Sequence, residues 1–136
     1  MHDPLVKHPG YTLRRASGAM TAELTQRLAD HGVRIVDATV LLWISENPQV
    51  TASALGRALD IQRANMVPLL KRLEDAGLIE RAPIDGKSQG LSLSEEGRKR
   101  VPAIEATIEA FEQDLLARIP LPHREHFMPA LDALWR

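Results

Sequence analysis

Hydrophobic residues recur every three or four positions through most of the chain, a spacing that predicts amphipathic helices. The pattern is clear over residues 11–30 and over residues 94–119. Residues 36–45 are apolar on almost every side, which predicts a central helix enclosed by the rest of the molecule. A final helix is expected over residues 123–134. The outer helices carry more apolar surface than a small core needs, which favours a helical dimerisation layer.

Two shorter helices joined by a tight turn are expected in the middle of the chain. Thr51 is the expected N-cap of the first helix, and Asp60-Ile61 interrupts the pattern before the second. Two helices in this arrangement form a helix-turn-helix, whose second helix can enter the major groove of DNA. One side of that second helix is apolar, with Met66, Leu69, Leu70 and Leu73.

A small hairpin should follow the helix-turn-helix. Gly77 supplies a helix C-terminus, and residues 78–81 and 90–93 are extended segments separated by turn-forming residues around Asp85-Gly86. The sequence therefore predicts a mainly α fold with a small β-wing, a winged helix-turn-helix with N- and C-terminal dimerisation helices.

The length of 136 residues fits one domain able to bury a core. Residues 35–100 would form the DNA-binding part, and residues 11–30 and 101–136 the dimerisation helices. Residues 51–100 contain nine Lys and Arg against seven Asp and Glu, a net +2, whereas the remainder has eight against eleven, a net −3. The asymmetry is in the direction that specific DNA binding requires.

The sequence lacks the residues or motifs that several classes of function require. Cysteine is absent, which excludes disulfides, thiolate metal sites and thiol redox sensing. His123 and His126 could share a helix face, but no third ligand is near, so no metal or other cofactor is expected. No nucleophile elbow, phosphate loop or dinucleotide fingerprint occurs, and no enzyme activity is expected. No apolar run is long enough to cross a membrane and no signal peptide is evident, so a cytoplasmic location is expected.

Gln62, Arg63 and Asn65 fall in the first turn of the second short helix, the part that points at base edges when such a helix docks. Arg can bond guanine in a bidentate fashion, and Asn and Gln can bond adenine. Gln62 has the alternative role of helix cap, and Arg63 that of a solvated side chain. Lys71 and Arg72 would meet phosphates or simply solvate the surface.

Pro68 interrupts the hydrogen-bond ladder of that helix and crowds the carbonyl group of Ala64. It either bends the helix to follow the groove or is a kink that packing tolerates. The sequence leaves both interpretations open.

Several motifs follow one another between about Pro9 and Gly97, beginning with the PGYTLRR segment. They continue through Leu55-Gly56-x-x-Leu59-x-Ile61, Leu73-Glu74-x-x-Gly77-Leu78-Ile79-x-Arg81, Asp85-Gly86-Lys87-Ser88 and Leu91-x-Leu93-Ser94-x-x-Gly97. The order and spacing of these motifs make the chain similar to the MarR family of winged-helix transcriptional regulators. The family pattern usually has two basic residues after the wing aspartate, whereas this chain has Gly86 and Lys87.

The resemblance implies a homodimer that binds double-stranded DNA at a pseudo-palindromic operator, as a repressor that responds to a ligand. At the wing tip, Lys87 and Ser88 would reach a minor groove or phosphates, whereas Asp85 would orient the tip by pairing with a nearby basic side chain and would not contact DNA. A winged-helix protein-interaction module without specific DNA binding is the alternative.

Many relatives hold a small aromatic or carboxylate effector in a crevice between the dimer helices and the winged part. The resemblance places Tyr11, Arg14, Arg15, His31 and Trp43 along that crevice, where an arginine could clamp a carboxylate. The alternative is that Trp43 belongs to the core and that one of the adjacent arginines faces water.

Overall fold

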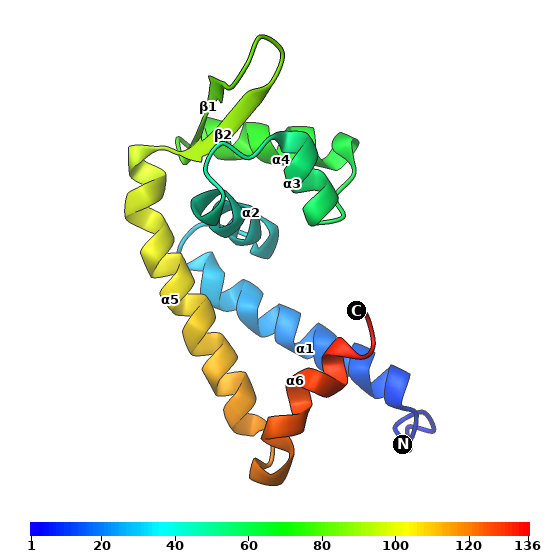
Figure 1. Ribbon diagram of the computed structural model, residues 1–136. Coiled ribbons are helices and arrows are strands. Elements are labelled where there is room, and N and C mark those ends of the chain that lie inside the picture. Colours follow the sequence, from blue (N-terminus) through cyan, green and yellow to red (C-terminus); the bar gives the residue numbers. More distant parts are fainter.

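Six α-helices, one short 3-10 helix and two strands follow one another in the computed structural model, which describes residues 1–136. Figure 1 shows the wing at one end of the molecule and the long helix α5 running from its base to the opposite end. The elements are α1 (Pro9–Ala29), α2 (Ile35–Glu46), α3 (Ala52–Ala58), α4 (Arg63–Asp75), β1 (Ile79–Pro83), β2 (Gln89–Leu93), α5 (Glu95–Arg118), η1 (Leu121–His123) and α6 (Arg124–Asp132). The expected fold class, mainly helical with a two-stranded wing, is confirmed.

The core lies between α2, α4, the wing strands and the first half of α5. It contains 17 buried hydrophobic residues, and α2 lies at its centre, as the continuous apolar run predicted. One expectation about α2 was wrong, because Trp43 is 39% exposed and does not belong to the core. At about 100° per residue, Leu41 and Ile44 take the core side of α2, which leaves Trp43 on the other side.

The turn between α3 and α4 depends on one close backbone approach. Thr51 caps α3 as expected, its hydroxyl accepting from the Ala54 amide at 3.1 Å. The Ile61 amide donates to the Gly56 carbonyl at 2.8 Å, and a Cβ on Gly56 would lie 2.9 Å from the Ile61 carbonyl oxygen. Asp60 completes the reversal with a φ of 52°. The chain can therefore begin α4 without a longer loop.

The two wing strands pair antiparallel, with Ile79 opposite Leu93 and Pro83 opposite Gln89, and so extend beyond the expected bounds toward the tip. The Asp85 carboxylate accepts from the backbone amides of Lys87 at 2.9 Å and of Ser88 at 2.8 Å. These hydrogen bonds hold the pKa of the Asp85 carboxyl below its ordinary value. The expectation that Asp85 pairs with a nearby basic side chain is corrected, because the tightly folded tip offers its carboxylate two backbone amides.

The wing joins α5 at a second close approach. Ser94 caps α5, accepting from the Gly97 amide at 3.0 Å and donating to the Gly77 carbonyl. A Cβ on Gly97 would lie 2.1 Å from the carbonyl oxygen of Leu78, a distance at which the backbone would have to move. Gly97 thus lets the start of α5 pack directly against the backbone of Leu78, the residue before β1.

Helices α1 and α5 are joined by a network of charges. Glu23 accepts hydrogen bonds from Arg118 and from Arg27, each at 2.8 Å, and Arg27 also pairs with Asp114 at 2.7 Å. Hydrogen bonds from Arg118 and Arg27 lower the pKa of the Glu23 carboxyl to about 2. Arg27 also lies over the ring of Phe111, its Cζ atom 5.5 Å from the ring centroid.

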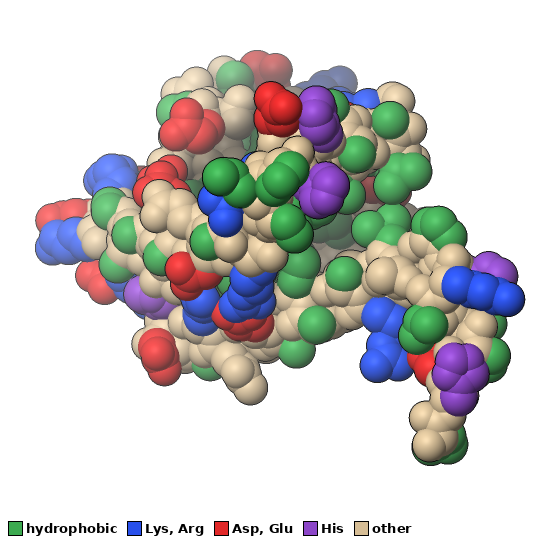
Figure 2. Space-filling model, turned by 90° about the horizontal axis from the view of Figure 1, so that it is seen from below, with side chains coloured by type: hydrophobic (Ala, Val, Ile, Leu, Met, Phe, Trp, Pro, Cys, Tyr) green, Lys and Arg blue, Asp and Glu red, His purple; other side chains and the backbone are tan.

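Beyond this network the terminal helices keep much of their apolar surface exposed. None of the residues of α6 is buried, and Trp135 just after it is 72% exposed. Figure 2, which views the molecule from below, shows hydrophobic side chains spread over this surface among charged groups. The larger exposed hydrophobic residues near the chain ends include Leu13, Leu116, Leu121, Met128 and Leu134. Among the helices, none has the length and hydropathy to cross a bilayer.

We predict that Gly97→Ala lowers the free energy of unfolding by about 1–3 kcal/mol, because the new Cβ would collide with the Leu78 carbonyl oxygen. Helix propensity alone would give the opposite sign. Urea denaturation at a fixed protein concentration measures the change. Gly86→Ala at the open wing tip is the control and should change stability by no more than about 0.5 kcal/mol. Equal stability of Gly97→Ala and the unmodified chain would contradict the packing described.

We also predict a pH signature of Glu23. In the folded protein the pKa of the Glu23 carboxyl is lower than its ordinary value of 4.5. Its contribution to the free energy of unfolding is therefore complete above about pH 4.5 and is lost as the pH falls toward 2. Glu23→Gln should therefore destabilise the protein at pH 7, and the difference should shrink between pH 4.5 and 2. Urea denaturation across this range measures it, with Glu109→Gln, an exposed position on α5, as control. A difference independent of pH would exclude the ion pairs as its origin.

Candidate nucleic-acid interface

Helix α4 presents its first turn to solvent. Its buried residues Met66, Leu69, Leu70 and Leu73 lie on one side, as predicted, and fix which side faces out. Gln62, Arg63 and Asn65 are all exposed. The three expected base-reading residues therefore meet the first requirement for contact with DNA, which is access.

Gln62 occupies the N-cap position of α4, but its side chain makes no capping hydrogen bond. Its backbone carbonyl accepts from the amides of Asn65 at 2.9 Å and Met66 at 3.0 Å. Gln62 therefore takes the N-cap position through its backbone, and its side chain does not cap the helix. The carboxamide is left free to bond another molecule.

Arg63 and Asn65 lie on different sides of the helix start, each beside a hollow. Arg63 lines a hollow of about 630 Å³ between α3 and α4. Asn65 lines one of about 760 Å³ between α4 and the segment leading into α2. Gln62 borders both hollows. The first turn of α4 thus lies between the two hollows, with Arg63 on one side and Asn65 on the other.

An ion pair between a buried carboxylate and a partly exposed arginine ties this helix to the centre of the molecule. Asp37 is 5% exposed and is the one charged residue that the core encloses. One carboxylate oxygen accepts from Arg72 of α4, and the other accepts from the Arg34 amide at 2.8 Å. The Arg34 Nε atom lies 3.6 Å from the second oxygen. Arg72 was expected to meet phosphates or to solvate the surface, but instead it joins α4 to α2.

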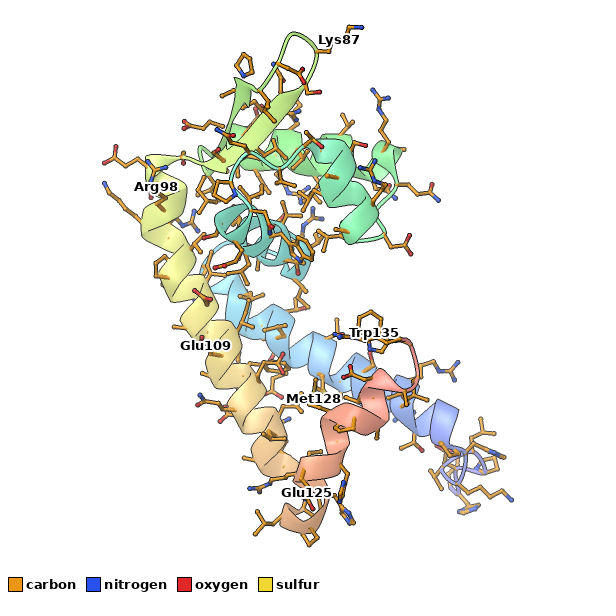
Figure 3. All side chains as sticks on the ribbon, viewed as in Figure 1. Lys87, Arg98, Glu109, Glu125, Met128 and Trp135 are labelled. Atoms are coloured by element: carbon orange, nitrogen blue, oxygen red, sulfur yellow. The ribbon has the colours of Figure 1, made fainter.

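The remaining basic groups near α4 are more exposed. Lys71 is 74% exposed and forms an ion pair with Asp75 at 3.2 Å, so part of its charge is neutralised locally. Lys87 lies at the wing tip and points away from the molecule in Figure 3. Ser88, next to it, is half-buried. The wing tip therefore offers one exposed cation on a tightly folded turn.

Sequence reasoning did not identify three residues that share the hollow with Arg63. Arg57 is exposed on α3 and donates to Ser53 at 2.8 Å, and Arg81 of the wing pairs with Glu74 at 2.6 Å. Val67 is 55% exposed on α4. Its spacing from Leu70 resembles that of a core residue, so the apolar pattern gave no signal of its exposure.

Helix α4 remains continuous through Pro68, which is exposed. The missing amide of Pro68 therefore falls on the solvent side and does not break the helix.

The expected effector residues form separate groups. Tyr11 donates from its hydroxyl to Asp3 at 2.6 Å and accepts from Arg15 at 3.2 Å. The guanidinium carbons of Arg14 and Arg15 lie 5.6 and 5.8 Å from the Tyr11 ring centroid. The Tyr11 hydroxyl, followed by the Leu5 amide, holds the pKa of the Asp3 carboxyl below its ordinary value. This N-terminal cluster combines an aromatic ring with two guanidinium groups.

His31 lies near the other end of α1. Its Nε2 atom is 2.7 Å from the Thr107 hydroxyl of α5, and its carbonyl accepts from Arg100. Twenty residues separate Tyr11 from His31, which corresponds to roughly 30 Å along a helix. One protomer therefore does not bring the five predicted effector residues together, and their role in a crevice of the dimer stays a prediction.

No group of three or more His, Cys, Asp or Glu residues is arranged to hold a metal ion. The Nε2 atom of His126 lies 3.1 Å from the carboxylate of its neighbour Glu125.

Comparison with known proteins supports the architecture. Residues 31–88, from the turn before α2 to the wing tip, match the model of the MarR family. The HTH-type transcriptional repressor Rv2887 of Mycobacterium tuberculosis is 28% identical over 127 residues, which cover 92% of this chain and 91% of that protein. A putative transcriptional regulatory protein for the hcr operon of Thauera aromatica is also 28% identical, over 100% of this chain and 84% of that protein.

Solved structures agree in fold. The structure of Rv2887 in complex with DNA superposes with a TM-score of 0.76 at 26% identity, covering 94% of this chain and 98% of that one. The repressor CouR bound to p-coumaroyl-CoA has a TM-score of 0.87 at 23% identity, covering 100% and 97%, and shows a shared fold alone. With its exposed helix start, its wing and these similarities, the chain resembles the MarR family of transcriptional regulators.

Proposed function

We propose that the chain is a homodimeric transcriptional repressor that binds a pseudo-palindromic DNA operator and responds to a small effector. The observation that carries the proposal is the exposed first turn of α4, where the side chains of Arg63 and Asn65 make no intramolecular hydrogen bond or ion pair. The exposed wing cation Lys87 adds a second basic group. Guanidinium and carboxamide groups can read guanine and adenine in the major groove, and an ammonium can contact phosphate. Repressors act on DNA, so the proposal includes a cytoplasmic location and no catalytic step.

The exposed apolar surface of the terminal helices supports the homodimer. Helix α6 buries none of its residues within one protomer. The side chains of Met128 and of the following Leu134 and Trp135 are more than half exposed. A two-fold dimer through these helices would place the wings and both copies of α4 away from the interface (Figure 1). Two copies of α4 one duplex turn apart would match a symmetric operator.

For the effector we propose a small aromatic or carboxylate compound. Structures of the relative Rv2887 contain salicylic acid and p-aminosalicylic acid. In this chain Tyr11, Arg14 and Arg15 supply a ring and two guanidinium groups, which suit an aromatic acid. His31 and Trp43, on other elements, would take part only if the second protomer completes the site. An effector that favours the DNA-incompetent spacing of the dimer would release the operator.

Selection of bound fragments from genomic DNA at physiological salt tests the proposed function directly. The proposal expects enrichment of a small set of fragments that share a motif with two-fold symmetry. A bound pool indistinguishable from the input would instead favour a winged-helix module that binds protein and not specific DNA.

We predict that Arg63→Ala weakens binding to the selected duplex by about 1–3 kcal/mol and relaxes the preference at one base position in each half-site. Fluorescence anisotropy at fixed salt measures the loss. Arg63→Lys is the matched control, since it keeps the charge but loses the bidentate geometry, and it should lose specificity while keeping affinity for random duplex. Equal binding by Arg63→Ala and the unmodified protein would exclude a base contact.

Lys87→Ala should weaken binding to all duplexes similarly, because a phosphate contact carries no sequence information. The slope of log affinity against log salt should fall by about one unit per protomer. Titrations at several salt concentrations measure the slope. Lys7→Ala, in the N-terminal segment far from the wing, is the charge-matched control (Figure 1). A slope that Lys87→Ala leaves unchanged would exclude a phosphate role for the wing tip.

A further inference from the structure

The part of α4 that faces directly away from the core is apolar over its first two turns. The buried side is set by Met66, Leu69, Leu70 and Leu73. At about 100° per residue, Ala64 and Pro68 lie opposite that side, and Val67 lies next to them toward Arg63. All three residues are exposed. We call Ala64, Val67 and Pro68 the apolar patch.

The patch cannot read DNA through side-chain hydrogen bonds. Its members carry no polar side-chain atom, and Pro68 also lacks a backbone amide hydrogen. Val67 is the one large hydrophobic residue of α3 and α4 whose side chain is exposed, at 55%. The polar side chains of Arg63 and Asn65 therefore flank the apolar patch, whose side chains can make only apolar contacts.

Cations surround the patch on the side of Val67. Arg63 lies one turn before Val67 and Lys71 one turn after, so both share its face of the helix. Arg57 and Arg81 line the same hollow as Val67. A partner that fits this surface must present an apolar group inside an anionic frame. The major groove of DNA does so wherever it contains thymine, because the thymine 5-methyl group is its one apolar feature.

We propose that Val67, with the rest of the apolar patch, contacts thymine 5-methyl groups and so determines an A·T preference within each half-site. This inference rests on the proposed function, since it assumes that α4 enters the major groove. The hydrogen-bonding groups of Arg63 and Asn65 would read the neighbouring base pairs. Methyl recognition would discriminate thymine from cytosine at positions where no hydrogen bond reports the difference.

Replacing thymine by uracil in the selected duplex tests the proposal. Uracil keeps base pairing and every hydrogen-bonding group and removes only the methyl group. Burying one methyl group is worth roughly fourfold in affinity, so we expect a loss of about that size at one or two positions per half-site. Uracil placed outside the half-sites controls for changed duplex flexibility and should have no effect.

Variants of Val67 assign the effect to this side chain. Val67→Ala removes the contacting methyl groups, so it should bind thymine and uracil duplexes alike at the sensitive position. Val67→Thr keeps the shape and one methyl group and should retain an intermediate difference. Because Val67 is 55% exposed, both variants should fold, and urea denaturation checks this. Arg63→Ala should keep the uracil effect at the Val67 position.

The outcomes separate the inference from the proposed function. No selected duplex at all would defeat the proposed function. A selected duplex that binds equally well with uracil at every half-site position would overturn the methyl contact while leaving DNA binding intact. A uracil loss of the same size in Val67→Ala and in the unmodified protein would overturn the assignment to Val67.

Discussion

The orientation of α4 depends on one buried carboxylate. An isolated charge in a protein interior is costly, and the cost is offset only by an opposite charge and hydrogen bonds in good geometry. Asp37 meets both conditions, through Arg72 on α4 and through the amide of Arg34. Rotating α4 about its axis would separate Arg72 from Asp37 and leave the carboxylate without its partner. The pair therefore helps to fix which residues of α4 face the core and which face solvent.

Helix α5 connects the end of the molecule that carries α4 and the wing to the terminal helices (Figure 1). Its start rests on Leu78 through Gly97, and its far half is joined to α1 through Glu23 and Arg118. Because both contacts lie on one continuous helix, a change in the angle between terminal helices would move the wing and α4 as a unit. Such rigid coupling suits a regulator whose effector alters the spacing of two DNA-binding ends.

The order of the elements followed from the apolar pattern because each helix buries one stripe and each cap is a local feature, as Thr51 and Ser94 show. Features set by distant residues were not predictable. The partner of Arg72 lies 35 residues away, the exposure of Trp43 depends on which side of α2 the core uses, and the effector candidates were placed together only by resemblance. Five of the six predicted DNA-binding residues are exposed and Ser88 is half-buried, and their contacts with DNA remain predictions.

The central claim is that two copies of α4 enter adjacent major grooves on one face of a duplex. Hydroxyl-radical footprinting on a selected duplex tests it most directly. The account predicts two protected stretches related by two-fold symmetry, with centres about 10 base pairs apart. Protection of one stretch only, or an even protection without symmetry, would contradict it.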